Sequence, residues 1–122
     1  MRIIRFRGKI MKYYYALYTD EHTKDKLERI KKKIEKNKWQ LEIYLITLTK
    51  NDNNHLEIFN SVLLLQEAIS KNELFVVGIA SGYTESLELV EKITQEVYDE
   101  TSGANIRSYI LQKQREYEEG NV

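Results

Sequence analysis

One stretch limits the folds open to this chain more than any other: residues 74–80, Leu-Phe-Val-Val-Gly-Ile-Ala, contain no polar side chain. β-Branched and aromatic residues favour strands, and a strand that is apolar without interruption must be covered on both faces. Such strands are typical of parallel sheets that lie between two layers of helices. The run therefore predicts an α/β fold with this strand at the centre of its sheet.

Three further segments, 12–18, 41–49 and 105–111, are rich in aromatic or β-branched residues and are also predicted to be strands. The segments between the strands, among them 22–37 and 54–70, carry apolar residues at helical spacing. Strands that alternate with helices imply right-handed crossovers and parallel neighbours. We expect a small three-layer βαβαβαβ domain with a mainly parallel four-stranded sheet in the flavodoxin-like order 2-1-3-4.

The alternative is a ferredoxin-like α+β fold, which would require part of 54–70 to be strand. The length and the wide apolar face of that segment favour a helix. Gly103, which follows the third predicted helix, is expected to end it in the left-handed conformation that glycine adopts easily.

A single domain is expected over residues 1–122. The sequence has no proline and five glycines, so no flexible linker divides it. Residues 1–10 are basic and alternate in polarity, and they form either an extension or an extra edge strand. Residues 112–122 are expected to be a polar C-terminal tail.

Cysteine is absent, which excludes disulfides and thiolate metal sites and fits a reducing compartment. The basic N-terminus lacks the apolar run of a secretory signal, and no stretch approaches membrane-spanning length. We therefore expect a cytoplasmic protein without a membrane partner.

A ligand site is predicted from the expected direction of the strands. In a parallel sheet the loops that follow the strands meet at one edge, where ligands bind. Gly82 allows close backbone approach, and the helix N-terminus after it would attract an anion. These two features predict an anionic or nucleotide-like small molecule as the ligand, although the turn lacks the remaining residues of the dinucleotide and Walker motifs. The candidate ligand-binding residues are Asp20, His22, His55, Ser81, Gly82 and Thr84.

Catalysis is not specified by any motif. No histidine pair has metal-ligand spacing, and the residues around Ser81 do not form the Gly-x-Ser-x-Gly elbow of a hydrolase. We predict no catalytic residue, no metal and no cofactor, and we favour a non-catalytic role while leaving enzymatic activity open.

Self-association is predicted from segment 54–70. As a helix it would be apolar over more of its circumference than one contact with a sheet requires. It is either covered within the chain or paired with a second copy, and we favour the homodimer. The first functional hypothesis is thus a small interaction or regulatory module that dimerises through this helix. Its candidate interface residues are Ile58, Val62, Leu64, Leu65 and Ile69.

The charges are divided unevenly along the chain. Residues 1–61 contain 14 Lys/Arg and 8 Asp/Glu, whereas residues 62–122 contain 5 and 11. Lysines crowd segment 22–37, where nucleic-acid phosphates could bind, but acidic residues at ion-pair spacing favour a solvated surface. Nucleic-acid binding is therefore the third hypothesis, after the interaction module and the small-ligand domain. Its candidate residues are Lys31, Lys32, Lys33 and Lys36.

Overall fold

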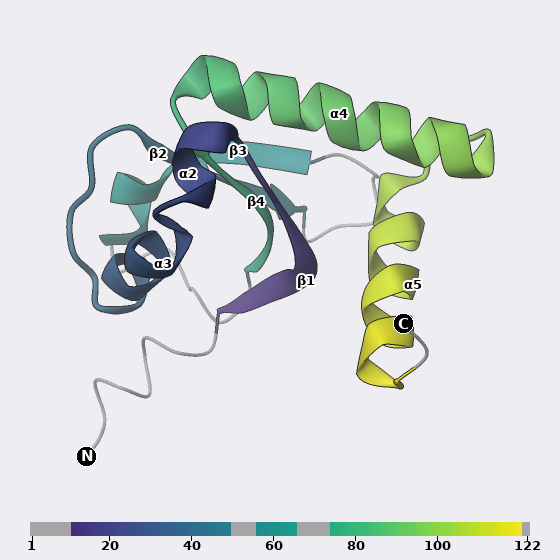
Figure 1. The fold of residues 1–122 in the computed structure, drawn as a ribbon, viewed down its shortest axis with the longest axis horizontal. Coiled ribbons are helices and arrows are strands. Elements are labelled where there is room, and N and C mark those ends of the chain that lie inside the picture. The colour runs from purple at the N-terminus through teal and green to yellow at the C-terminus, as the bar shows by residue number, and fades with distance from the viewer. Residues whose placement is uncertain (1–10, 50–55, 66–73, 121–122) are drawn as a thin grey trace.

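The computed structural model describes residues 11–49, 56–65 and 74–120, and the possible N-terminal extension at 1–10 falls outside them. Helices and strands do not alternate regularly along the chain (Figure 1). The elements are β1 (Lys12–Thr19), α2 (Glu21–Lys24), α3 (Leu27–Glu35), β2 (Ile43–Leu48), β3 (Leu56–Asn60), the 3-10 helix η1 (Ser61–Leu65), β4 (Phe75–Ser81), α4 (Tyr83–Thr101) and α5 (Ile106–Glu118).

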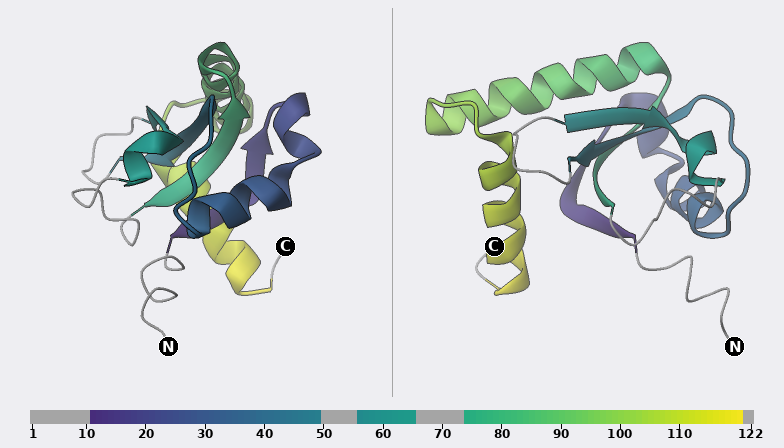
Figure 2. Two further views of the ribbon diagram at one scale, coloured as in Figure 1. Left: turned by 90° about the vertical axis from the view of Figure 1, so that its left-hand side faces the viewer. Right: turned by 180° about the vertical axis from the view of Figure 1, so that it is seen from behind.

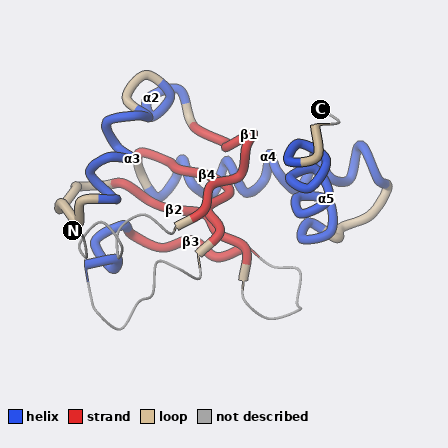
Figure 3. The backbone as a smooth tube through the Cα atoms, turned by 90° about the horizontal axis from the view of Figure 1, so that it is seen from below, coloured by secondary structure: helices blue, strands red, loops and turns tan. Residues whose placement is uncertain are grey.

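The sheet is mixed and has the strand order β1-β4-β2-β3, which can be followed in Figure 3. β1 is parallel to β4, whereas β2 is antiparallel to both β4 and β3. The predicted parallel sheet with flavodoxin-like order 2-1-3-4 is therefore wrong, and the ferredoxin-like α+β alternative is compatible with this sheet. An apolar run reports burial on both faces, and burial does not determine the direction of the neighbouring strands.

β4 is the well-covered inner strand that the sequence predicts. Residues Val76 to Ala80 are all buried, because helices cover both faces of the sheet. On one face Val77 packs in a cluster with Ile93 of α4 and Ile110 of α5. On the other face Val76 packs in a cluster with Ile30 of α3. The three-layer arrangement is thus present without the parallel sheet.

Segment 54–70 is not a helix where the structure describes it. Leu56 to Asn60 form β3, which pairs antiparallel with β2, and the chain then makes the 3-10 helix η1. Ile58 packs against the cluster on the α4 side and Phe59 against the cluster on the α3 side. The apolar residues thus alternate between the two faces of a strand, which accounts for a surface that looked too wide for one helix.

Segment 105–111 is also corrected, since it begins α5 instead of forming a fourth predicted strand. Asn105 is the N-cap, and its Oδ1 accepts a hydrogen bond from the backbone N–H of Ser108 at 3.0 Å. Ile106 and Ile110 are buried one helical turn apart. The expected polar tail at 112–122 is a continuation of this helix as far as Glu118.

α4 runs over the sheet and α5 turns away from its end, as the right-hand view of Figure 2 shows. The residue that adopts the left-handed conformation at the end of α4 is Ser102, with φ 61°, and not Gly103. None of the helices in the described ranges combines the length and the apolar character needed to span a bilayer.

β1 arches away from β4 in its middle. Tyr13 pairs with Val76 and Tyr18 pairs with Gly78, so four residues of β1 lie opposite a single residue of β4. A side chain at Gly78 would approach the carbonyl oxygen of Tyr18 to 3.2 Å, so glycine lets the end of the arch come close. Within the arch, the backbone N–H of Tyr15 donates to Oε1 of Gln114 on α5 at 2.8 Å.

Candidate ligand-binding cleft

Two of the predicted ligand-binding residues meet at the edge where β1 and β4 end. Asp20 follows β1, and its Oδ1 accepts hydrogen bonds from the backbone N–H of Ser81 at 3.0 Å and from Thr23 Oγ1 at 2.5 Å. Thr23 Oγ1 also lies 2.7 Å from Ser81 Oγ. Thr23 is fully buried and was not selected from the sequence. The cluster joins the ends of two parallel strands to the short helix α2.

The loops after all three predicted strands do not converge at this edge. Because β2 is antiparallel to β4, its first residue Ile43 pairs with Ser81, and its last residue Leu48 pairs with Leu56 at the opposite edge. The expectation that the loop after β2 lies beside Ser81 is therefore wrong. His55 lies outside the described residues.

Gly82 and Thr84 have positions that a structural role explains. Gly82 is the N-cap of α4 with φ 125°, and a Cβ there would overlap Oε1 of Glu85. The Glu85 carboxylate thus occupies the space beside the turn, where it would repel an anion. Thr84 is exposed in the first turn of α4, and no side chain caps this helix.

An open cleft of about 460 Å³ lies at the same edge, lined by His22 and Ser81 together with residues of α3 and of the long connection from α3 to β2. This connection is the loop at the left of Figure 1. The cleft is also lined by Lys26, Arg29, Lys33, Trp39, Gln40, Leu41 and Glu42.

Three basic side chains line the cleft: Lys26 is the N-cap of α3, and Arg29 and Lys33 lie within the helix. Lys26, Arg29 and Lys33 are three and four positions apart, which places them in a row along the helix. All three are exposed, and no carboxylate in the described part of the chain lies within ion-pair distance of any of them. Three basic side chains and one carboxylate, that of Glu42, therefore line the described part of the cleft.

The nucleic-acid candidates are dispersed around α3. Lys33 lines the cleft, whereas Lys31 lies 3.8 Å from Glu28 and 4.6 Å from the centre of the Tyr13 ring. Lys32 and Lys36 are exposed and do not line the cleft. The sequence had pointed to the density of lysines, although the spacing of positions 26, 29 and 33 is the signal that identifies the row.

Trp39 and Leu41 provide an apolar part of the cleft that sequence reasoning missed. Their side chains are 60% and 68% exposed, although they belong to the residue types that proteins usually bury. Gln40 between them is buried, and its Nε2 donates to the carbonyl oxygen of Ile30 at 3.3 Å. This hydrogen bond attaches the connection to α3 and fixes where the two apolar side chains emerge.

Glu42 lines the cleft with a strained backbone. Its φ of 62° lies in the left-handed region, which costs a residue with a side chain about 1 kcal/mol. Residues held in such conformations cluster at ligand sites, because the surrounding structure has to enforce them. Glu42 is also an isolated carboxylate beside three cations.

Among the described residues, the cleft combines basic side chains with the exposed Trp39 and Leu41. Ser81 Oγ is engaged with Thr23, and among the described residues no histidine forms a hydrogen bond with it. His22 is exposed at the same cleft. The described ranges also contain no group of three or more histidine, aspartate or glutamate side chains that could hold a metal ion.

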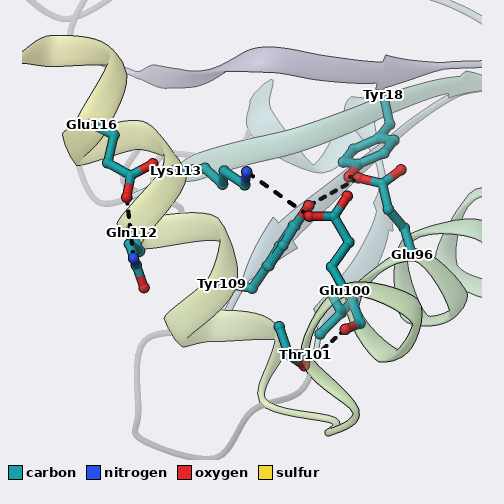
Figure 4. Close-up of polar contacts among 9 residues, drawn as sticks. Tyr18, Glu96, Glu100, Thr101, Tyr109, Gln112, Lys113 and Glu116 are labelled. Carbon is teal, nitrogen blue, oxygen red and sulfur yellow. Dashed lines mark hydrogen bonds and ion pairs between the residues drawn. The ribbon is translucent and has the colours of Figure 1, made fainter. Parts of the chain in front are cut away.

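A second polar cluster joins β1, α4 and α5 (Figure 4). Tyr18 donates its hydroxyl to Oε2 of Glu96 at 2.6 Å, and the Tyr109 hydroxyl lies 3.4 Å from the same oxygen. Burial and the hydrogen bond to Glu96 raise the pKa of Tyr18. Burial and the carboxylates of Glu100 and Glu96 raise the pKa of Tyr109. Both phenols are therefore neutral donors, and the cluster connects three elements of the fold.

The proposed interface residues lie on β3 and η1 or beyond them. Leu64 is buried in the core on the α3 side, and Ile58 and Val62 are partly buried. The side chain of Leu65 and the whole of Ile69 lie outside the described residues. The continuous helical face that was expected to support a dimer is absent from 56–65.

Comparison of the chain with protein-family models, with curated proteins and with solved structures gives no match.

Proposed function

We propose that this chain is a binding domain for a small anionic molecule, which it holds in the cleft between α3 and the connection to β2. One observation carries the proposal: Lys26 at the N-cap of α3 and Arg29 and Lys33 within the helix have no carboxylate partners among the described residues. They line one cleft together with the exposed Trp39.

Repulsion between the basic side chains that line the cleft supports this function. Like charges three or four positions apart on a helix destabilise it by a few tenths of a kcal/mol per pair. A bound anion converts this repulsion into charge-assisted hydrogen bonds, which contribute about 1.5–3 kcal/mol each. Binding of an anion would thus relieve the repulsion among the three basic side chains.

The two other hypotheses have less support. The interaction module depended on an apolar helix over 54–70, but residues 56–65 form a strand and a 3-10 helix. Nucleic-acid binding depended on the lysines that crowd segment 22–37, and one of its four candidate residues, Lys31, is paired with Glu28 and lies over the Tyr13 ring. The anionic small molecule fits the described residues best.

Fluorescence provides a direct test, because Trp39 is the only tryptophan of the chain. We expect orthophosphate, pyrophosphate or tripolyphosphate to change its emission saturably at low ionic strength, with weaker binding as salt is added. Arg29→Gln and Lys33→Gln should each weaken binding roughly tenfold, since each removes a charge-assisted hydrogen bond.

Lys32→Gln is the matched control, because it removes the same charge from the same helix outside the cleft. It should leave the affinity within about twofold, as long-range charge effects are screened by salt. The absence of a saturable change with all three anions would refute the proposal. An equal loss in the Lys32 and Arg29 variants would show that anions respond to the net charge of the helix and not to the cleft.

A further inference from the structure

We infer that the anionic molecule held by this cleft is a nucleotide, with its base on Trp39 and its phosphates on α3. The inference rests on the proposed function and specifies its ligand. It depends on two residues that a site for a simple oxyanion would not need, Trp39 and Glu42.

Trp39 offers a flat apolar surface to the cleft. Trp39 is 60% exposed, and the adjacent Gln40 is buried and donates a hydrogen bond to the carbonyl oxygen of Ile30. Stacking of a base on an exposed aromatic ring contributes substantially to nucleotide binding and tolerates any base. Phosphate alone gains nothing from such a ring, so Trp39 indicates a ligand with a planar part.

Glu42 indicates a ligand that also donates hydrogen bonds. A carboxylate beside Lys26, Arg29 and Lys33 weakens the attraction of the cleft for any simple anion. An ionised carboxylate can only accept hydrogen bonds, and the ribose hydroxyls and exocyclic amines of nucleotides are donors for it. Acidic residues bind the ribose in dinucleotide sites for the same reason. Glu42 is exposed, and its backbone has the left-handed conformation that is enriched at ligand sites.

The volume of the cleft agrees with a single nucleotide. About 460 Å³ lies within the range of small-molecule sites, roughly 300–1,000 Å³. A longer strand would have to continue beyond the cleft towards the exposed Lys32 and Lys36. Short oligonucleotides therefore belong in the experiment as a competing ligand.

Isothermal titration calorimetry with EDTA present separates the contribution of the base to the affinity from that of the phosphates. The ligands are the four ribonucleoside triphosphates, tripolyphosphate and a single-stranded oligonucleotide of mixed sequence. We expect at least one nucleoside triphosphate to bind about tenfold more tightly than tripolyphosphate, which corresponds to one stacked base.

Variants assign this preference to residues. Trp39→Leu should abolish it, Trp39→Phe should retain most of it, and both should bind tripolyphosphate like the unmodified chain. Glu42→Gln should weaken nucleotide binding several-fold while strengthening that of tripolyphosphate, because the repulsion is removed. Tyr98→Leu is the control, since Tyr98 is another exposed aromatic residue, 58% accessible on α4 and outside the cleft.

Three results would overturn the inference. If tripolyphosphate binds as tightly as every nucleotide and Trp39→Leu changes nothing, the ligand is a simple anion and the proposed function stands. If the oligonucleotide binds while no nucleotide exceeds tripolyphosphate, the ligand is a single strand. If no anion binds the unmodified chain, the proposed function fails together with the inference. Circular dichroism of each variant confirms that loss of binding is not loss of folding.

Discussion

The backbone N–H of Ser81 donates a hydrogen bond of 3.0 Å to Oδ1 of Asp20, and this contact joins the ends of two parallel strands that are 61 residues apart in the sequence. The same carboxylate oxygen accepts a hydrogen bond from Thr23, so Asp20 also holds the first turn of α2 against the sheet. The start of α2 and the wall of the cleft at Ser81 are thus positioned by one side chain.

Removal of that side chain should therefore destabilise the fold. Asp20→Ala removes the acceptor of the Ser81 N–H and one of the two hydrogen-bond partners of the buried Thr23 hydroxyl. We expect a loss of about 1–3 kcal/mol in the free energy of unfolding. Urea denaturation measures it. Asp25→Ala, an exposed carboxylate of the same segment, should change the stability by less than about 0.5 kcal/mol. Equal effects of the two variants would contradict a specific role of Asp20.

Stability should fall at alkaline pH. Burial raises the pKa values of Tyr13, Tyr14, Tyr18 and Tyr109 above that of a free tyrosine, which is 10.0. Above about pH 10 the unfolded chain releases these protons while the folded chain retains them. The contribution of the four tyrosines to the free energy of unfolding is therefore fully present below that pH and decreases above it.

Urea denaturation between about pH 8 and pH 11 measures this decrease, to which each tyrosine contributes at most about 1.4 kcal/mol per pH unit. Tyr18→Phe removes one contribution and should make the decrease less steep. Tyr98→Phe, the same substitution at an exposed position, is the control. A stability that stays constant through this range would show that the four phenols titrate as they do in the unfolded chain.

Gly82 should not tolerate alanine. Its φ of 125° belongs to a region that only glycine occupies readily, and a Cβ would overlap the Glu85 carboxylate. We expect Gly82→Ala to cost about 2 kcal/mol or more in thermal or urea denaturation. At Gly103 a Cβ would make an ordinary contact of 3.6 Å with Thr101, so Gly103→Ala should be far milder. The reverse ranking would mean that the turn before α4 differs from the one described.

Ser102 offers the opposite opportunity. Ser102 ends α4 in the left-handed conformation at φ 61°. This conformation is unfavourable for residues that have a Cβ atom, and glycine adopts it easily. Ser102→Gly should therefore raise the free energy of unfolding by about 0.5 kcal/mol or more. Ser108→Gly, the same substitution inside α5, should lower it by up to about 1 kcal/mol. A loss of stability in both variants would refute the assignment of Ser102 as the helix end.

The position of β4 could be predicted from the sequence because a strand that is buried on both faces needs apolar residues at successive positions. The direction of its neighbours imposes no such requirement. In a mixed sheet the β2 strand enters at the edge where β1 and β4 leave, and nothing in residues 41–49 reveals this. Asp20 and Ser81 consequently lie at one edge of the sheet, whereas β2 ends at the opposite edge.

Two segments were assigned the wrong type for related reasons. Short apolar runs fit a strand or a buried helix equally well, and 56–60 lies on a strand that packs on both sides. Residues 105–111 contain strand-forming side chains, but Asn105 caps a helix and tertiary packing of Ile110 outweighs local propensity. The cleft could not be predicted from the sequence because the turn after α3 and the hydrogen bond of the buried Gln40 together bring α3 and Trp39 side by side.

The arch in β1 has a consequence for how the chain opens. β1 is held to β4 in two short stretches, around Tyr13 and around Tyr18, and the residues between them are not paired with β4. Either stretch can separate while the other stays closed, so we expect hydrogen exchange along β1 to divide into two independently protected groups of amides. The group at Tyr18 adjoins Asp20, and a ligand in the cleft should slow exchange there while leaving the group at Tyr13 unaffected.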